Sequence, residues 1–471
     1  MKIVVLGAGI CGLVAGTMLA RDGHDVTLVE RDPEPVPDSI EAAWEAWSRA
    51  GVVQFRQAHY LQPRGRAVLE EELPDVAAAL AAAGAMRFDV LSVMPPTIAD
   101  REARRGDERF GTLTARRPVL EQVLARAAEE QPGLDVRRGV GVSGLEARAG
   151  AGGSTHVTGV VCEGGERLRA DLVVDAMGRR SPMPGWIADA AAAAVPEEAE
   201  DSGFVYYTRF FRSRGHGLPP FRSAPLTPIG TFTILVLPSD NDTWCVTLYS
   251  SAGDRPLKRL RHREKWEAVV RACPAHVQWL EGGEPLTEVL PMGGIVDRYR
   301  RMVVEGRPIV TGVALLGDAW SCTNPSAGRG MTLGLLHARH LRDVAREAAD
   351  DPRRFALAWD EATETHLTPW YRETVREDRA RLREIDALRR GEDPRAGMPA
   401  GAAAVAGALP RAMAHDPDVF RAFIETRACL ATLDEVLARP GMAERILEIA
   451  GEREAVRPPG PDRAQLLALL G

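Results

Sequence analysis

Three short glycine-containing segments carry the residues whose types and spacing could do chemistry. The first is Gly7-Ala8-Gly9-Ile10-Cys11-Gly12, near the start of a 471-residue chain. Glycines in such a segment permit a tight turn and let backbone N–H groups approach a phosphate, and the following helix adds partial positive charge. Glu30, with Arg31 beside it, ends the next expected strand, where its carboxylate suits ribose hydroxyls. Gly7, Gly9, Gly12 and Glu30 therefore predict a dinucleotide site.

The second segment is Asp171-Leu172-Val173-Val174-Asp175-Ala176-Met177-Gly178. It reads as a buried strand that ends at Asp175, after which Gly178 allows a sharp turn beside the adenine side of the first site. Taken alone, it could equally be an ordinary strand end with a turn glycine. The order of the three segments favours a place for Asp175 and Gly178 at the cofactor site.

The third segment runs from Gly317-Asp318 through Pro325 to Gly328-Arg329-Gly330-Met331. Asp318 closes a strand, where its carboxylate can accept a hydrogen bond from a polyol hydroxyl. The helix that begins at Gly328–Met331 can direct free N–H groups at the pyrimidine end of a flavin and stabilise the anion formed on reduction. Together the three segments predict one site that holds FAD along its whole length.

Composition excludes several other classes of function. A net charge of -7 argues against a nucleic-acid partner. Six scattered cysteines fit a reducing cytoplasm. No metal is expected, since the histidines lack ligand spacing; His337 and His340 are three apart but have no third ligand nearby. No stretch reaches the roughly 18 apolar residues of a spanning helix, and the early glycines indicate β-α-β rather than a signal peptide.

The expected elements form an α/β fold in which a Rossmann-like domain is interrupted by a second sheet. Strands are expected at 2–6, 25–30, 171–175 and 308–316, helices at 10–21 and 117–131, and antiparallel strands at 136–147 and 156–170 around a turn at 149–153. Aromatic and β-branched strands at 204–211, 232–237 and 243–249, with a turn at 240–242, predict the inserted antiparallel sheet.

Three regions follow from these elements. The FAD-binding domain is expected at 1–182 and 301–345, the antiparallel-sheet substrate domain at 183–300, and a helical C-terminal region at 346–471. Residues 372–390 form a highly charged helix, which we interpret as a solvated face that covers the FAD domain rather than a partner site.

With these segments in place, the sequence resembles the FAD-dependent aromatic-hydroxylase and squalene-epoxidase-like monooxygenases, including bacterial polyether-type epoxidases, over most of the first 345 residues. Further segments that carry the resemblance are Gln54-Phe55-Arg56-Gln57-Ala58-His59, 175–182 and 201–209. The resemblance implies that Arg117 contacts the FAD and that Arg56 lies near the flavin or pyrophosphate. The chain departs from many relatives at Ala319-Trp320, where they have Ala-His, and at Met331-Thr332, where an Asn is usual.

The resemblance implies an FAD-dependent monooxygenase that epoxidises or hydroxylates a hydrophobic secondary metabolite with O₂, through a flavin C4a-hydroperoxide. NAD(P)H, with NADPH preferred, would reduce the flavin either directly or through a separate flavin reductase, since no second GxGxxG segment is present. Such chemistry needs no Ser/His/Asp set because the cofactor carries it. His59, Tyr206, Arg209 and Trp320 are candidates for tuning or substrate contact, with core hydrogen bonding or packing open for each.

Alternative functions share the same cofactor. Halogenation is disfavoured, because tryptophan-type halogenases need an early Lys and a Trp-x-Trp segment, and this chain has no Lys between residues 2 and 258. A flavin-dependent reductase or dehydrogenase of a lipid-like substrate keeps all three segments. A non-catalytic FAD-retaining protein, with residues 335–471 as a dimer face, is disfavoured by the intact Asp318 and Pro325. A monomer and a homodimer both stay open.

Overall fold

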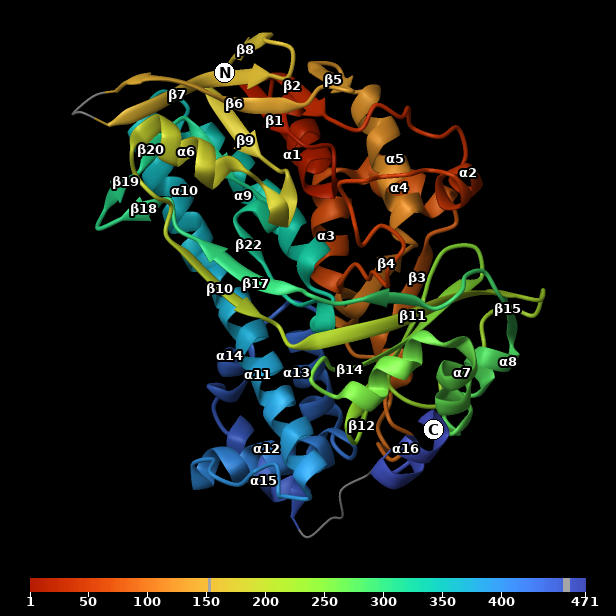
Figure 1. Ribbon diagram of the computed structural model, residues 1–471. Helices are drawn as coiled ribbons and strands as arrows, with labels where there is room; N and C mark the ends of the chain where they lie inside the picture. Colours follow the sequence, from red (N-terminus) through yellow and green to blue (C-terminus); the bar gives the residue numbers. More distant parts are fainter. Residues whose placement is uncertain (151–153, 452–457) are drawn as a thin grey trace.

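The computed structural model describes residues 1–150, 154–451 and 458–471 (Figure 1). Its centre is a five-stranded parallel sheet in the order β21-β9-β1-β2-β5. Four of these strands are short, largely apolar and buried, as expected when both faces of a parallel sheet are covered, whereas the edge strand β5 buries only Leu134. Their bounds are β1 (Lys2–Leu6), β2 (Asp25–Glu30), β5 (Leu134–Arg138), β9 (Leu172–Asp175) and β21 (Val313–Leu315).

Helices cover one face of this parallel sheet, and a second, small sheet also packs against it (Figure 1). The helices are α1 (Ile10–Arg21), α2 (Ile40–Glu45), α3 (Pro63–Glu72), α4 (Pro74–Ala82), α5 (Arg117–Glu129) and α9 (Gly330–Ala348). Residues 63–82 form two helices, α3 and α4, because Pro74 cannot donate the hydrogen bond that would continue α3. The small sheet contains β6 (Val142–Ala149), β7 (Thr155–Cys162), β8 (Arg167–Arg169) and β20 (Val310–Thr311). Residues 151–153 of the turn expected at 149–153 lie outside the described residues.

The inserted region forms the expected antiparallel sheet. Its strands are β11 (Phe204–Ser213), β12 (Leu226–Ile229), β13 (Phe232–Pro238), β14 (Thr243–Ser251), β15 (Gly283–Pro285) and β16 (Leu290–Met292). The β13–β14 hairpin turns through Asn241 and Asp242, both with positive φ, a conformation that Asn and Asp tolerate well. Its core contains Trp244 of β14, Trp266 of α7 (Arg263–Arg271) and Trp279 of α8 (Gln278–Glu281). The last helix, α16 (Arg463–Leu470), packs on the same core.

Two short sheets connect these regions. One joins β10 (Glu197–Asp201), β17 (Val296–Arg300) and β22 (Ser321–Cys322), and the other pairs β3 (Met86–Asp89) with β4 (Gly111–Thr114). The helix α6 (Met183–Ala191), which a boundary at residue 183 assigns to the inserted domain, packs Met183 and Ile187 into the large core instead. The minor pair β18 (Val303–Val304) and β19 (Arg307–Pro308) completes the strand set of the described chain.

The C-terminal region is helical, which together with the two sheets confirms the predicted fold class. It contains α10 (Pro352–His366), α11 (Thr368–Arg390), α12 (Ala400–Met413), α13 (Pro417–Arg427), α14 (Leu433–Leu437) and α15 (Met442–Ala450). In Figure 1, α10 lies against α9 of the FAD-binding domain, and the helices that follow it, in blue, extend to the antiparallel sheet, whereas α16 packs on the outer helices of that sheet. The tail therefore contacts both other regions.

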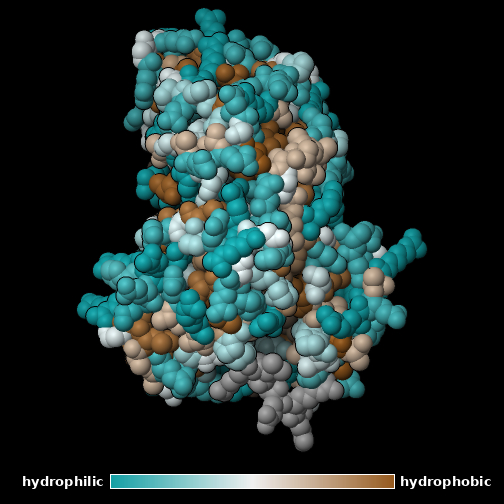
Figure 2. Space-filling view, turned by 90° about the vertical axis from the view of Figure 1, so that its right-hand side faces the viewer, coloured by the Kyte–Doolittle hydropathy of each residue, from teal (hydrophilic) through white to brown (hydrophobic). Residues whose placement is uncertain are grey.

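Charged and polar side chains dominate the face shown in Figure 2, where hydrophobic residues form small separate groups. A contiguous apolar patch usually marks a membrane or partner surface, and this view of the described residues shows none. Among the described helices, none is both long and apolar enough to cross a membrane.

Candidate functional site

The register of the parallel sheet brings the three glycine segments to one edge. Leu6 of β1 pairs with Val29 of β2 and with Asp175 of β9, and Leu315 of β21 also pairs with Asp175. The turns that follow these strands therefore meet at the carboxyl end of the sheet, where ligands bind in open α/β folds. One cavity is lined there by Gly7, Gly9, Glu30, Arg31, His59, Arg117, Met177, Gly178, Arg179, Asp318, Pro325, Gly328, Gly330 and Met331.

The first glycine segment makes a tight turn that leaves the N-terminus of α1 at the cavity. Gly7 has φ of +102°, and a Cβ on Gly12 would lie 2.0 Å from the Gly7 carbonyl oxygen, so only glycine allows this approach. Gly9 is the N-cap of α1, and no side chain caps the helix. Its first N–H groups are thus left for a ligand at the cavity wall, as a dinucleotide pyrophosphate requires.

Glu30 lies buried beside this turn and already accepts three hydrogen bonds. Its Oε2 accepts from the Ala8 N–H at 2.9 Å and from Arg49 Nη2 at 2.8 Å, and its Oε1 accepts from the Asp32 N–H at 3.0 Å. A carboxylate has about four acceptor positions, so Glu30 keeps capacity for a ribose hydroxyl.

Sequence reasoning missed Arg49, which lines the cavity and is almost fully buried. Its guanidinium contacts Glu30 and, through Nη1, the Oε2 atom of Glu121 at 2.9 Å. The other oxygen of Glu121 accepts from Arg117 Nε at 2.6 Å. A chain of alternating charges thus connects the Glu30 end of the cavity to Arg117. An isolated arginine in an irregular segment gives no sequence signal for this role.

His59 continues this chain and is held as a neutral imidazole. Arg117 Nη1 lies 3.1 Å from His59 Nε2, and the guanidinium can only donate, so Nε2 accepts. His59 Nδ1 then carries the proton and donates to the Gln57 carbonyl at 2.9 Å. Burial, together with the positive charge of Arg117, lowers the pKa of His59 to about 3. With both nitrogens engaged, His59 orients Arg117 rather than moving a proton.

Asp318 lies on the wall of the same cavity. Burial raises the pKa of its carboxyl, an effect opposed by the positive charges of Arg117 and Arg179. Gly317, the residue before it, adopts φ of +58°. Its N–H donates to His337 Nδ1 of α9 at 3.0 Å, and this hydrogen bond fixes the turn. A half-buried carboxyl group on a cavity wall fits a ligand that donates hydroxyl hydrogen bonds.

The helix α9 begins at the same place and lacks a side-chain cap. Gly330 and Met331 of its first turn line the cavity, as does Gly328, whose φ is +62°. The cavity therefore has an uncapped helix N-terminus on two walls, with the Asp318 carboxylate between the segments that carry them. This donor and acceptor set fits FAD, whose pyrophosphate, polyol and pyrimidine ring need N–H donors, an acceptor and N–H donors respectively.

Other predicted cofactor residues support the cavity without lining it. Asp175 is fully buried and accepts from Ser181 Oγ at 2.5 Å and the Met177 N–H at 3.0 Å, which shapes the turn that carries Gly178. Burial raises the pKa of Asp175 to about 6. Arg56 donates to the carbonyls of Trp44 and Trp47, both at 3.0 Å, and so holds the segment before Arg49 rather than facing the cavity.

Three candidates for substrate contact lie away from the cavity wall. Arg209 is buried in the inserted domain, where it pairs with Glu267 at 2.6 Å. Trp320 packs edge-on against Tyr299 and His337, a core role. Tyr206 donates to Asn324 Oδ1 at 2.8 Å and so contacts the segment that precedes Pro325.

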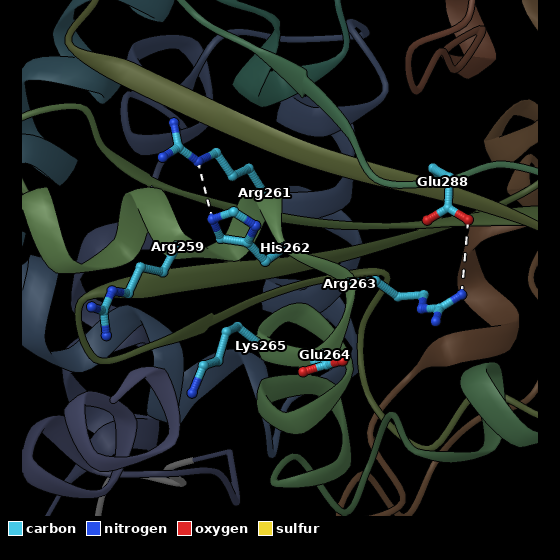
Figure 3. Close-up of a pocket in the computed structure, with 7 residues that line it drawn as sticks. All are labelled: Arg259, Arg261, His262, Arg263, Glu264, Lys265 and Glu288. Atoms are coloured by element: carbon cyan, nitrogen blue, oxygen red, sulfur yellow. Dashed lines mark hydrogen bonds and ion pairs between the residues drawn. The ribbon is translucent and has the colours of Figure 1, made fainter.

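A second hollow, on the outer side of the inserted domain, contains none of the predicted residues. Figure 3 shows its lining of charged side chains from the 259–265 segment, with Glu288 opposite. Two of its cations serve structure, since Arg259 and Lys265 donate to the carbonyls of Leu470 and Leu469 at the end of α16. Cations at a helix C-terminus complement its dipole, so this basic hollow fastens the tail helix.

Comparison with known proteins agrees with this geometry. The model of the FAD binding domain family matches residues 1–345. The chain belongs to this family and is an FAD-dependent oxidoreductase. Protein Rv3254 of Mycobacterium tuberculosis is 28% identical over 373 residues, which cover 72% of this chain and 72% of that protein.

Two solved structures share the fold. PqsL, a probable FAD-dependent monooxygenase from Pseudomonas aeruginosa, aligns with a TM-score of 0.61 at 16% identity and covers 83% of this chain and 98% of its own. The OxyS anhydrotetracycline hydroxylase from Streptomyces rimosus aligns with a TM-score of 0.55 at 19% identity, over 91% of this chain and 76% of its own. These two structures show that the chain shares their fold, and the match of the family model over residues 1–345 shows the FAD-binding family.

Proposed function

We propose that this protein is an FAD-dependent monooxygenase that epoxidises or hydroxylates a hydrophobic small molecule, a secondary metabolite, with NADPH as the reductant. The observation that carries the proposal is the continuity of the cavity. The wall that contains Gly9, Asp318 and Gly330 continues to Met292 and Ile295, apolar residues contributed by the inserted region. A flavin bound at Gly9, Asp318 and Gly330 would therefore lie in the same cavity as an apolar substrate that contacts Met292 and Ile295.

The residues of the chain have separable tasks in this proposal. The N–H groups at the start of α1 bind the pyrophosphate, and those at the start of α9 stabilise negative charge at the pyrimidine ring. Asp318 accepts from the ribityl hydroxyls. FAD held by these residues would supply the redox chemistry that activates O₂, from which the transferred oxygen atom would come. The apolar wall at Met292 and Ile295 excludes water and places the substrate.

The histidine among the described lining residues, His59, is not placed to act as a base at neutral pH. His59 is neutral with both nitrogens hydrogen-bonded. This arrangement favours oxygen transfer to an alkene, which needs no protein base, over phenol hydroxylation, which is helped by one. Epoxidation is therefore the preferred form of the proposal.

The test begins with the FAD-loaded protein under anaerobic conditions. NADPH should reduce the flavin, and mixing with O₂ and a panel of lipophilic alkenes and phenols should yield product. With ¹⁸O₂, one heavy atom should enter each product molecule. Product that forms without O₂ would instead establish a flavin-dependent reductase or dehydrogenase. If NADPH leaves the flavin oxidised but dithionite supports the ¹⁸O result, a separate reductase is the electron donor.

A matched pair of variants connects this activity to the site. Asp318→Ala should abolish FAD retention or turnover, because it removes a carboxylate that lines the cavity together with Gly9 and Gly330 of the two helix starts. Asp189→Ala removes an exposed carboxylate at the end of α6 and should leave both unchanged. Full activity in Asp318→Ala would contradict the placement of the cofactor.

A further inference from the structure

The segment that connects Asp318 to α9 is held from two sides by buried carboxylates. The Asn324 N–H donates to Asp297 Oδ1 of β17 at 2.6 Å. The Ser326 hydroxyl donates to Asp378 Oδ1 of α11, also at 2.6 Å. Asp297 and Asp378 are 3% and 4% exposed, so both bonds lie in the interior, where a hydrogen bond to a carboxylate is strong.

Arg329, between the two cavity glycines of this segment, is fastened to the same helix. Its side chain is 1% exposed and lies 3.0 Å from Glu373 Oε1. It also donates to Thr374 Oγ1 at 3.0 Å and to the Thr426 carbonyl of α13 at 3.2 Å. Glu377 completes the neutralisation at 3.3 Å. A buried guanidinium with these partners has one position, because displacing it would leave charges unpaired.

We propose that α11 is a positioning element of the flavin site. Asp378 and Glu373 fix Ser326 and Arg329, and through them the backbone N–H groups of Gly330 and Met331 on the cavity wall. This inference rests on the proposed placement of the flavin at residues 323–331. Preorganised donors bind a charged ring without the cost of ordering the chain at that moment. The helical tail is thus a part of the cofactor site although it contributes no residue to the cavity lining.

The surroundings of Asp378 make its hydrogen bond with Ser326 sensitive to pH, which a purely structural contact would not be. Hydrogen bonds from the Ser326 and Asn324 side chains act on the carboxyl of Asp378 and lower its pKa, against the effect of burial. Asp297 faces it from β17, Glu377 stands beside it on α11, and the hydroxyl groups of Tyr206 and Tyr249 face it from β11 and β14. Burial raises the pKa of Asp378 to about 7. The carboxyl of Asp378, which holds the segment at Ser326, therefore changes its charge near neutral pH.

The experiment measures FAD affinity of the full-length apoprotein by flavin fluorescence. Ser326→Ala and Asp378→Ala should each weaken FAD binding about tenfold, the effect of losing one buried charged hydrogen bond. Because both variants remove the same bond, the double variant should bind no more weakly than either single one. Asp378→Asn, which keeps an acceptor oxygen, should bind FAD as the wild type does at low pH. Arg383→Ala, an exposed cation on α11, is the matched control.

The pH dependence and one further variant separate the ways in which the inference could fail. Between pH 5.5 and 8.5 the affinity of the wild type should change several-fold and that of Asp378→Asn should stay level. Equal affinities in all variants and the wild type, or additive losses, would overturn the inference. Gly328→Ala, which forces alanine into φ of +62°, tests the flavin placement itself. If it weakens FAD binding and the Ser326 and Asp378 variants do not, the placement stands and the role of α11 is wrong. If Gly328→Ala binds FAD normally, the placement is wrong and the inference falls with it.

Folding of the variants is followed in the same samples. Ser326→Ala deletes one hydroxyl, and its apoprotein should unfold within about 2 °C of the wild type. Should Asp378→Ala fail to fold, Ser326→Ala and the pH profile of Asp378→Asn still decide the question. No change in either of these would overturn the inference.

Discussion

Arg117 Nη1 lies 3.1 Å from His59 Nε2, and this contact fixes both groups. The guanidinium has its Nε on Glu121, and the imidazole has its Nδ1 on the Gln57 carbonyl. Neither side chain has freedom to rotate without breaking a buried hydrogen bond. The resemblance in sequence assigns Arg117 to the cofactor, and the structure adds the histidine that holds it.

Replacing His59 by alanine should weaken FAD binding without creating a new pH dependence. The loss of one hydrogen bond to a charged group corresponds to roughly 1–2 kcal/mol, or about tenfold in affinity. Because burial lowers the pKa of His59 to about 3, the wild-type imidazole stays neutral from pH 5 to 9. Flavin fluorescence titration at several pH values checks both points. His216→Ala, at an exposed histidine, is the control; a loss that shrinks as pH falls through 6.5 would show that His59 titrates normally.

The first glycine segment should separate folding from cofactor binding. A Cβ on Gly12 would lie 2.0 Å from the Gly7 carbonyl oxygen, so Gly12→Ala must push α1 away from β1 and should lower the free energy of unfolding by about 3 kcal/mol. A Cβ on Gly9 meets no protein atom within 4 Å, and Gly9 lines the cavity. Gly9→Ala should therefore fold normally and bind FAD less well. Thermal unfolding of the apoproteins and FAD titration measure the two effects; equal unfolding temperatures would contradict the packing argument.

Local patterns predicted much of the fold because the relevant signals are local. A strand, three glycines and Glu30 occupy one βαβ unit, and the turn at Asn241 needs only its own residues. The site was harder to predict where its partners are distant in sequence. Arg49 meets Glu121 across 72 residues, and Arg329 meets Glu373 across 44. No periodicity marks such pairs, because their proximity arises from tertiary packing.

The interpretation of 372–390 as a solvated face was wrong in part for the same reason. Mixed charges on a helix usually indicate exposure. Here Glu373, Thr374 and Asp378 are buried, because Arg329 and Ser326 from a distant turn neutralise and hydrogen-bond them. The exposed Arg372 and Arg379 pair with Glu198 and Glu200 of β10, as a solvated face would. Sequence alone does not distinguish the two faces of α11.

Docking of α16 should depend on one ion pair. Arg463 contacts both oxygens of Asp254, at 2.6 and 2.8 Å, and Asp254 is fully buried. Arg463→Ala leaves that carboxylate without its close partner, which should lower the free energy of unfolding by roughly 2–4 kcal/mol. Chemical denaturation measures the change. Arg463→Ala with Asp254→Asn should recover part of the loss, whereas Arg353→Ala, at an exposed arginine on α10, should have no effect. Equal stability of the two arginine variants would show that the pair does not hold the helix.

The pH dependence of stability should carry the mark of Asp378. Burial raises its pKa in the folded protein to about 7, against an ordinary value of 3.8. The folded state then holds the proton more tightly than the unfolded state, so the stabilising contribution is complete below pH 4 and is lost as pH rises through 7. Asp378→Asn stays neutral throughout. Its free energy of unfolding relative to the wild type should rise by roughly 2–4 kcal/mol between pH 4 and 8. Asp189→Asn, at an exposed position, should show a flat difference in the same urea titrations. A flat difference for Asp378→Asn would mean that its carboxyl ionises as in water, and that the environment described for it is wrong.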